Sequence, residues 1–282
     1  MWANCPLQWK LAYVDKLKKN DASIHTAFGS AIHEAIQSWL AVRFSDKPTA
    51  IKNAFDINGV FKDELFRLFK EAITVDAVTK TKIYLCDQDT LREFYLDGCA
   101  ILSHVRKYQN EFFPTAGYEL IGCEVPLEMR LTNDVDFIAY IDIVIKHTRT
   151  NKIFIYDLKT SKAGWWHEKK DAKKTNQVLL YKEFYSRQYD IALENIFVSF
   201  IILKRKIKED SQWDAKRIVK FEPSHGSISM KKMNTEFNTF ISTTFGPDNT
   251  ILLDNLIATP SKSACRWCPF RENKALCAES VY

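Results

Sequence analysis

The stretch KIFIYDLKTSK, residues 152–162, decides how the central part of this chain folds. Its apolar residues 153–156 are typical of a strand in the interior of a sheet. Asp157 and Lys159 then follow two positions apart, and a strand directs such residues to one face, roughly 6.5–7 Å apart. A carboxylate and an ammonium therefore share a face at the end of a buried strand. A weak surface ion pair would explain them, so the rest of the chain must distinguish that alternative from a functional site.

The segments around this strand predict a mixed sheet. Residues 118–131 and 136–147 read as strands, and the short polar breaks after them favour antiparallel connections. A helix is expected over roughly 174–190, followed by another buried strand over 195–206. A strand, a crossover helix and a second strand imply a parallel pair. The fold class is therefore α/β, a mixed central sheet flanked by helices.

Helices are expected to dominate the rest of the chain. Residues 29–44 carry apolar side chains at helical spacing, and 51–113 read as several amphipathic helices. A further helix is expected near 229–245, before an irregular tail that carries cysteines. We expect one domain over 1–282, with a mainly helical region at 1–115, a mixed-sheet core at 116–225 and the helix and cysteine tail at 226–282.

The composition is that of an ordinary globular protein, with 46% hydrophobic and 27% charged residues. No apolar run approaches the ~20 residues that cross a membrane, and the N-terminus lacks a signal-peptide pattern, so we expect a cytoplasmic protein without a membrane partner. Seven cysteines in a reducing compartment do not predict a disulfide framework. The net charge of +5 is compatible with a polyanionic partner. Basic clusters at 16–19, 168–174 and 204–208 are either solvated surfaces or phosphate contacts.

A second acidic residue strengthens the functional interpretation. Asp142 interrupts the apolar strand 136–147, and a charge in a sheet core needs a partner. Asp142 and Asp157 on neighbouring strands can hold a hard divalent cation through their oxygens. Lys159 beside them can orient a water molecule or stabilise phosphoryl charge. The alternative is that Asp142 is solvated at a strand end.

Two helices supply further candidates. His33 lies four residues after Gly29 on one helical face, where the glycine is expected to leave open space over the imidazole. His33 is a candidate metal ligand or an ordinary helix histidine. Gln177 and Tyr181 are also four apart, and their polar ends are expected near the end of the Asp157 strand. They either contact phosphate or bases or belong to an ordinary amphipathic helix.

In chain order, the motifs GSAIH, YIDIV, YDLKT and QVLLY resemble those of the PD-(D/E)XK nuclease superfamily, in particular its RecB-type exonuclease branch. The resemblance implies a restriction-endonuclease-like core and a metal-dependent DNA nuclease that uses Mg²⁺ or Mn²⁺. The matching residues are His33, Asp142 and Asp157 as metal ligands, Lys159 as the catalytic lysine, and Gln177 and Tyr181 as the branch's Q-x3-Y motif.

Two positions depart from the superfamily pattern. Ile141 stands where the family name has proline, and Asp157 stands where glutamate is more usual. Glu124, on the preceding strand, is a candidate assisting residue. The resemblance further implies exonuclease action on single-stranded DNA ends, and it leaves open a role in repair, CRISPR adaptation or phage replication.

The cysteines resemble those of the iron–sulfur subclass of these nucleases, which includes CRISPR-associated adaptation exonucleases and AddB-type helicase–nucleases. One N-terminal cysteine and a C-terminal trio would hold a 4Fe–4S cluster, with zinc as the alternative. These four residues are Cys5, Cys265, Cys268 and Cys277. The other three cysteines, Cys86, Cys99 and Cys123, are expected to be buried core thiols.

Two functions of other classes remain open on the sequence. One is a non-catalytic DNA-binding module that keeps the nuclease fold, and metal-dependent cleavage of labelled DNA would separate it from an enzyme. The other is a zinc-stapled interaction protein, which metal content and the visible spectrum would identify. Protein partners are also left open.

Overall fold

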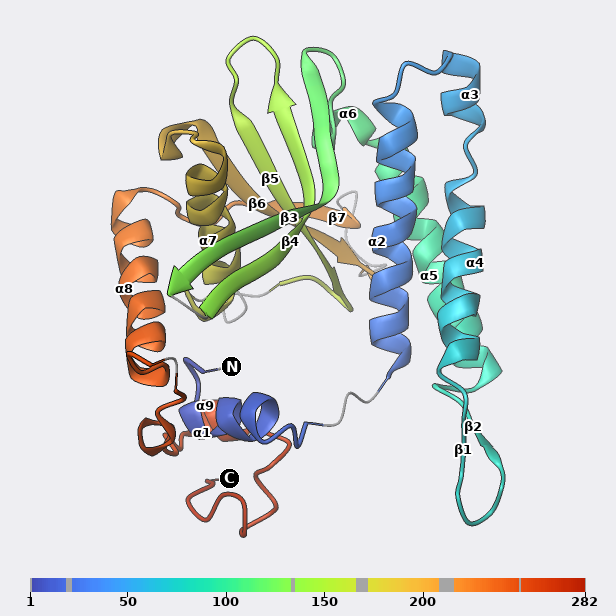
Figure 1. The fold of residues 1–282 in the computed structure, drawn as a ribbon. Helices are drawn as coiled ribbons and strands as arrows, with labels where there is room; N and C mark the ends of the chain where they lie inside the picture. Colours follow the sequence, from blue (N-terminus) through green and yellow to red (C-terminus); the bar gives the residue numbers. More distant parts are fainter. Residues whose placement is uncertain are drawn as a thin grey trace. The chain divides into compact units, whose positions relative to one another are not determined.

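A central five-stranded sheet organises the computed structural model (Figure 1), which describes residues 2–18, 22–132, 135–165, 172–207, 216–248 and 250–281. The chain divides into two compact units. The cysteine unit comprises Met1–Asp21, Arg130–Phe137 and Gly226–Tyr282, and the sheet unit comprises Ala22–Met129 and Ile138–His225. A single nuclease domain over the whole chain stays a prediction. None of the described helices is long and apolar enough to cross a membrane.

The sheet is mixed, as the sequence predicts. Its strand order is β3-β4-β5-β6-β7, and β5 pairs antiparallel with β4 and parallel with β6. β7 pairs antiparallel with β6 at the edge. The strands are β3 (Tyr118–Thr132), β4 (Val135–His147), β5 (Ile153–Ser161), β6 (Ile196–Lys204) and β7 (Ile218–Phe221). β5 therefore carries its apolar residues and then Asp157 and Lys159 in the interior of the sheet.

Helices cover both faces of this sheet. Leu158 belongs to the core that α2 (Ile24–Arg43), α4 (Ile57–Glu71) and α5 (Gln88–Lys107) share with the sheet. The preceding residue, Asp157, contacts α7 (Ala172–Tyr189) instead. Because successive strand residues point to opposite faces, α2 and α7 lie on opposite sides of β5. The active-site candidates on these two helices therefore approach β5 from different sides.

Helix α2 begins five residues before the predicted start. Ser23 and Thr26 form a capping box that satisfies backbone N–H groups at the helix N-terminus. Along the helix, Phe28, Ile32 and Leu40 are at most 1% exposed, so the helix is fixed against the core. This placement positions His33, which lies on the same helix.

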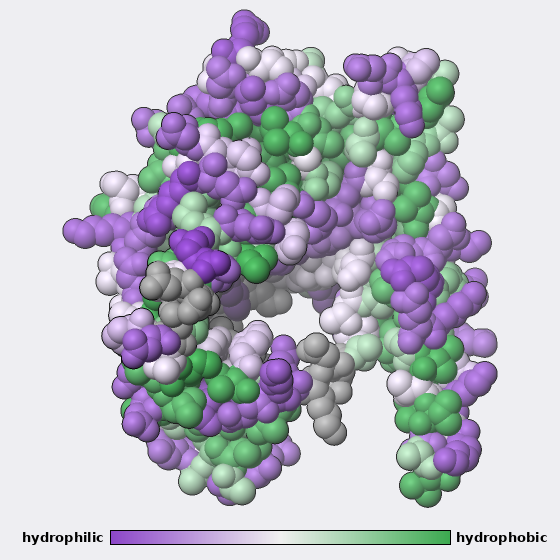
Figure 2. All heavy atoms as spheres, in the orientation of Figure 1, coloured by the Kyte–Doolittle hydropathy of each residue, from purple (hydrophilic) through white to green (hydrophobic). Residues whose placement is uncertain are grey.

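One feature of the sheet unit differs from the expectation of helices over 51–113. The strands β1 (Thr74–Val75) and β2 (Lys82–Ile83) form an antiparallel hairpin between α4 and α5. Asp76 fixes its turn by accepting hydrogen bonds from the N–H groups of Val78 and Thr79. The hairpin exposes apolar residues, which Figure 2 shows as a hydrophobic area over β1 and β2. The two short helices of this unit not yet named are α3 (Thr49–Ala54) and α6 (Gln109–Phe112), and a 3-10 turn spans Leu193–Asn195.

The cysteine unit brings the two ends of the chain together. Its elements are α1 (Pro6–Trp9), a π-helix (Lys10–Val14), α8 (Ser227–Thr244), a 3-10 turn (Leu253–Asn255) and α9 (Lys262–Cys265). The Leu7 N–H donates to the Ile257 carbonyl at 3.1 Å, and the rings of Trp9 and Phe240 meet edge to face. Leu11 and Phe270 share a small buried core. The N-terminal and C-terminal segments are therefore packed side by side within this unit.

All seven cysteines are free thiols. Cys86, Cys99 and Cys123 are partly rather than fully buried, and they pack against the main core. The expectation of core thiols is thus correct in place and wrong in degree of burial.

Candidate active site

The two aspartates meet where β4 and β5 separate. The regular pairing of these strands ends at Ile143 and Tyr156, so Asp142 and Asp157 stand opposite each other at the next step. There a side chain replaces the backbone hydrogen bonds between the two strands, because Asp142 Oδ2 accepts a hydrogen bond of 2.6 Å from the Leu158 N–H. Asp157 and Lys159 therefore lie within β5, not at its end as the sequence predicts, at the point where a carboxylate replaces the backbone acceptor of the neighbouring strand.

His33 and Glu124 complete a triangle around Asp142. The donor atoms of His33, Glu124 and Asp142 all lie within 4.8 Å of one another, with His33 Nδ1 3.7 Å from Asp142 Oδ2. Burial lowers the pKa of His33, although the charge of Asp157 acts in the opposite direction. A neutral imidazole keeps a lone pair for a cation. One imidazole and two carboxylates are a donor set that suits Mg²⁺ or Mn²⁺.

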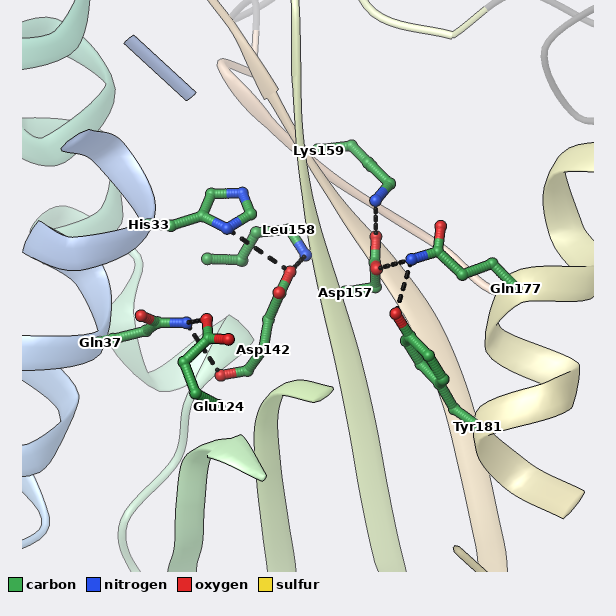
Figure 3. A network of polar contacts seen from close by, with 9 residues as sticks. All are labelled: His33, Gln37, Glu124, Asp142, Asp157, Leu158, Lys159, Gln177 and Tyr181. Carbon is green, nitrogen blue, oxygen red and sulfur yellow. Dashed lines mark hydrogen bonds and ion pairs between the residues drawn. The ribbon is translucent and has the colours of Figure 1, made fainter. Parts of the chain in front are cut away.

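Gln37 links two members of this triangle, Glu124 and Asp142, by hydrogen bonds (Figure 3). Its Nε2 donates to Glu124 Oε1 at 2.6 Å and to the Asp142 carbonyl at 3.2 Å, and the residue is only 8% exposed. The sequence analysis did not identify Gln37. Its position one helical turn after His33 is the signal that could have found it.

Glu124 reaches the site through an unusual backbone. Its φ of 49° lies in the left-handed region, which is uncommon for a residue other than glycine. Such a conformation costs roughly 1–2 kcal/mol and is often found at functional sites. The conformation breaks the alternation of β3 at the residue that faces Gln37. No pattern in the sequence indicates it.

The other side of the site belongs to β5 and α7. Lys159 Nζ lies 2.8 Å from Asp157 Oδ2, and Gln177 Nε2 donates to Asp157 Oδ1 at 2.9 Å and to the Tyr181 hydroxyl at 2.7 Å (Figure 3). Asp157 is 1% exposed, whereas the Lys159 side chain is 34% exposed. Asp157 Oδ2 forms an ion pair with the Lys159 ammonium, and the described residues give it no further partner. The structure thus brings together the four residues that the sequence places here.

Negative charge is poorly compensated at this site. Burial raises the pKa of Asp142 to about 6, and it raises the pKa of Asp157 to about 6 against the opposing effect of Lys159. Burial also raises the pKa of Tyr181 to about 12, which keeps its phenol protonated. A bound cation would supply the positive charge that the buried carboxylates lack. The buried Asp157 Oδ2, which is paired with the Lys159 ammonium, and the His33–Glu124–Asp142 triangle both fit such an ion.

Two expectations of the sequence analysis need adjustment. A Cβ on Gly29 would meet Thr160 Oγ1 of β5 at 3.6 Å, so this glycine faces the sheet and does not open space over His33. The basic clusters are described only in part, because Lys19, residues 168–171 and Lys208 lie outside the described residues. Their contact with phosphates stays a prediction.

Comparisons with known proteins agree with the motifs and the sheet. The sequence profile of the PD-(D/E)XK nuclease superfamily matches residues 2–273. The chain therefore belongs to this superfamily, whose members are nucleases that use divalent metals such as Mg²⁺ or Mn²⁺. No curated protein matches significantly.

One similar solved structure is protein VC1899 from Vibrio cholerae. It has 9% sequence identity and a TM-score of 0.26, and the match covers 83% of this chain. The chain spans 56% of the length of that protein.

Proposed function

We propose that this protein is a metal-dependent DNA nuclease of the RecB-type branch, acting as an exonuclease on single-stranded ends. The observation that carries the proposal is the convergence of Asp142, Asp157 and Lys159 where the pairing of β4 and β5 stops, beside His33 of α2. Membership of the nuclease superfamily supports the chemistry. The preference for single-stranded ends rests on the resemblance of the motifs to the RecB-type branch.

In this proposal, His33, Asp142 and Asp157 hold the metal, and Glu124 joins them from β3. When bound, Mg²⁺ or Mn²⁺ polarises the scissile phosphate and lowers the pKa of water. Gln37 holds the Glu124 carboxylate in place.

The α7 side supplies the groups that act on the reacting atoms. Lys159 orients the attacking water or stabilises the charge that develops on the phosphate, because its ammonium is partly open to solvent. Gln177 keeps one Asp157 oxygen fixed and links it to Tyr181. Asp157 is therefore aligned by α7 from one side and by Lys159 from the other.

Digestion of three labelled DNA forms tests the proposal. Linear single-stranded, linear double-stranded and circular single-stranded DNA are each incubated with Mg²⁺, with Mn²⁺ or without added metal. We expect metal-dependent loss of nucleotides from linear single strands and no change in the circle. Cleavage of the circle would make the protein an endonuclease. Binding without cleavage under every condition would make it a non-catalytic DNA-binding module.

We further propose that the cysteine unit binds a 4Fe–4S cluster. All four candidate thiols line one cavity within this unit, and they come from both ends of the chain. Burial raises the pKa of Cys268, and the nearby thiols of Cys5, Cys265 and Cys277 raise it further. Four neighbouring thiols are a donor set that a positively charged metal site would stabilise as thiolates. A cluster that binds only the folded arrangement would also add to stability.

The cluster is tested by metal content and spectrum, independently of nuclease activity. Anaerobically purified protein is expected to be brown and to carry about four irons per chain. Cys268→Ser should lose the colour and the iron, whereas Cys86→Ser, which changes a cysteine of the sheet unit, should keep both. Colourless protein with one zinc per chain would exclude the cluster and leave the nuclease proposal standing.

A further inference from the structure

A polar cavity of about 270 Å³ lies in the sheet unit, away from the candidate active site. It is formed by the C-terminal end of α2, by α3 and by the ends of α5 and α6. None of the candidate catalytic or metal-binding residues lines it. The basic residue that α2 contributes to the cavity is Arg43. It comes ten residues after His33 on the same helix, which is a distance of roughly 15 Å along the helix axis.

Three cations meet in this cavity without an acidic residue. Arg43, Lys52 and Arg106 come from α2, α3 and α5, and no carboxylate is among the lining side chains of the described residues. In the part of the chain that the structure describes, none of the three forms an ion pair. By contrast, Arg67 of α4 and Arg187 of α7 each contact carboxylates closely.

The acceptors that these cations do have are neutral. Arg43 donates to the side chains of Gln109 and Asn110 and to the Phe113 carbonyl, and Arg106 donates to the Asn53 carbonyl at 3.0 Å. Burial lowers the pKa of Arg43, so its charge is held in surroundings that do not compensate it. Arg43 also braces α2 against α6, and its position in the cavity is thereby fixed.

We propose that this cavity binds a terminal phosphate group, carried by a nucleotide or by the end of a nucleic-acid strand. Three cations suit a phosphate monoester, which carries close to two negative charges at neutral pH. Arginine forks match phosphate oxygens in bidentate fashion, and lysine adds a point charge. The hydroxyl groups of Thr49 and Thr115 also line the cavity and can donate to the remaining oxygens. This inference does not depend on nuclease activity.

Two of the three cations, half-buried Lys52 and exposed Arg106, can be replaced while Arg43 stays in place. Lys52→Gln combined with Arg106→Gln removes two of the three charges and leaves Arg43 in place. Lys62→Gln combined with Arg92→Gln is the matched control, because both residues are exposed on α4 and α5, lie outside the cavity and carry the same charges. Circular dichroism melting of both double variants verifies that each one folds.

Calorimetry without divalent metal then compares deoxyadenosine 5′-monophosphate with deoxyadenosine. We expect the unmodified protein and the control variant to bind the monophosphate and not the nucleoside. The Lys52→Gln, Arg106→Gln variant should bind the monophosphate at least tenfold more weakly. Equal affinity in the two double variants, or no binding to the unmodified protein, would overturn the proposal.

A second comparison identifies the source of the phosphate. A single-stranded oligonucleotide with a 5′-phosphate is titrated against the same oligonucleotide with a 5′-hydroxyl, again without divalent metal. Tighter binding of the phosphorylated strand that the Lys52→Gln, Arg106→Gln variant loses assigns the cavity to strand ends. Equal binding of the two strands, with the monophosphate still bound, assigns it to a free nucleotide. Because no step requires cleavage, an inactive protein could still bind phosphate here, and an active one could fail to do so.

Discussion

The two sides of the active site differ in how completely their side chains are held. On the α7 side, Asp157 is pinned by Gln177 and Lys159, and Gln177 is itself bonded to Tyr181. On the α2 side, Gln37 and the Leu158 N–H hold the Glu124 and Asp142 carboxylates at 2.6 Å, but His33 Nδ1 lies 3.7 Å from Asp142 Oδ2 and keeps its lone pair free of that carboxylate. A pinned carboxylate suits a group that must keep one orientation during a reaction. Converging donors with spare lone pairs suit a group that must accept a ligand. We therefore propose that metal affinity depends mainly on the α2 side and chemistry mainly on the α7 side.

Lys159→Ala should have the largest effect, because it removes the cation on the side assigned to chemistry. Loss of one group that stabilises transition-state charge typically costs about 10²–10³-fold in turnover. We expect at least that loss in metal-dependent DNA cleavage, with nearly unchanged DNA affinity. Cleavage rates and binding are measured beside Lys62→Ala, an exposed lysine of α4, which should behave like the unmodified protein. Near-normal turnover of Lys159→Ala would remove this residue from the mechanism.

Asp142→Asn and Asp157→Asn test the division of labour directly. Both replacements should weaken Mn²⁺ binding, because both carboxylates are proposed ligands. Asp142→Asn should weaken it more, by at least about tenfold, since Asp142 belongs to the triangle with His33 and Glu124. Calorimetric titration of Mn²⁺ measures both affinities. A greater loss in Asp157→Asn would mean that the α7 side, and not the α2 side, dominates metal binding.

The metal-free protein should gain stability as the pH falls from 7.5 to 5.5. Burial raises the pKa of Asp157 to about 6, above the value of 3.8 for an exposed aspartate. The folded chain therefore binds more protons than the unfolded chain in this range, and stability is lost as the pH rises through about 6. We expect a Tm difference of a few degrees. Asp157→Asn lacks the titrating group, so its Tm should vary less with pH, and identical pH profiles for both proteins would contradict the assignment.

The strands that build the site could be predicted because burial leaves a pattern. The apolar run before Asp157 and the apolar segment around Asp142 both indicate buried strands, and both form as expected. The hairpin of β1 and β2 could not be found this way. Its strands have two residues each and are exposed, so they show no apolar alternation, and the turn depends on local hydrogen bonds of Asp76. β7 could not be predicted for the same reason, because it has only four residues and lies at the edge of the sheet.

The residues of the candidate site likewise fall into those that sequence spacing indicates and those that it does not. Asp157 and Lys159 are two positions apart on a strand, and Gln177 and Tyr181 are one helical turn apart, so spacing indicates a shared face within each pair. Glu124 becomes part of the site through its left-handed backbone and through Gln37, which is 87 positions away. Neither relation depends on a periodic pattern. Sequence spacing does not indicate the proposed phosphate cavity either, because α2, α3 and α5 each contribute a single cation to it.

The smallest expected effect concerns two glycines that a sequence pattern cannot distinguish. Gly29 of α2 and Gly98 of α5 are both interior helix residues. A Cβ on Gly29 would make an ordinary contact of 3.6 Å with Thr160 Oγ1, whereas a Cβ on Gly98 would lie 2.2 Å from the Phe61 ring. Phe61 is fully buried, so the ring has little freedom to move away.

Gly29→Ala should therefore leave cleavage unchanged and raise stability by about 0.5–1 kcal/mol, since alanine restricts the unfolded helix segment more than glycine does. Gly98→Ala, the matched control, should lower stability by about 1–3 kcal/mol through overpacking. Denaturant unfolding measures both changes, and cleavage of labelled DNA is followed in parallel. If Gly29→Ala instead lost activity while remaining folded, the glycine would be needed for access to His33, and the α2 side would be more crowded than its contacts indicate.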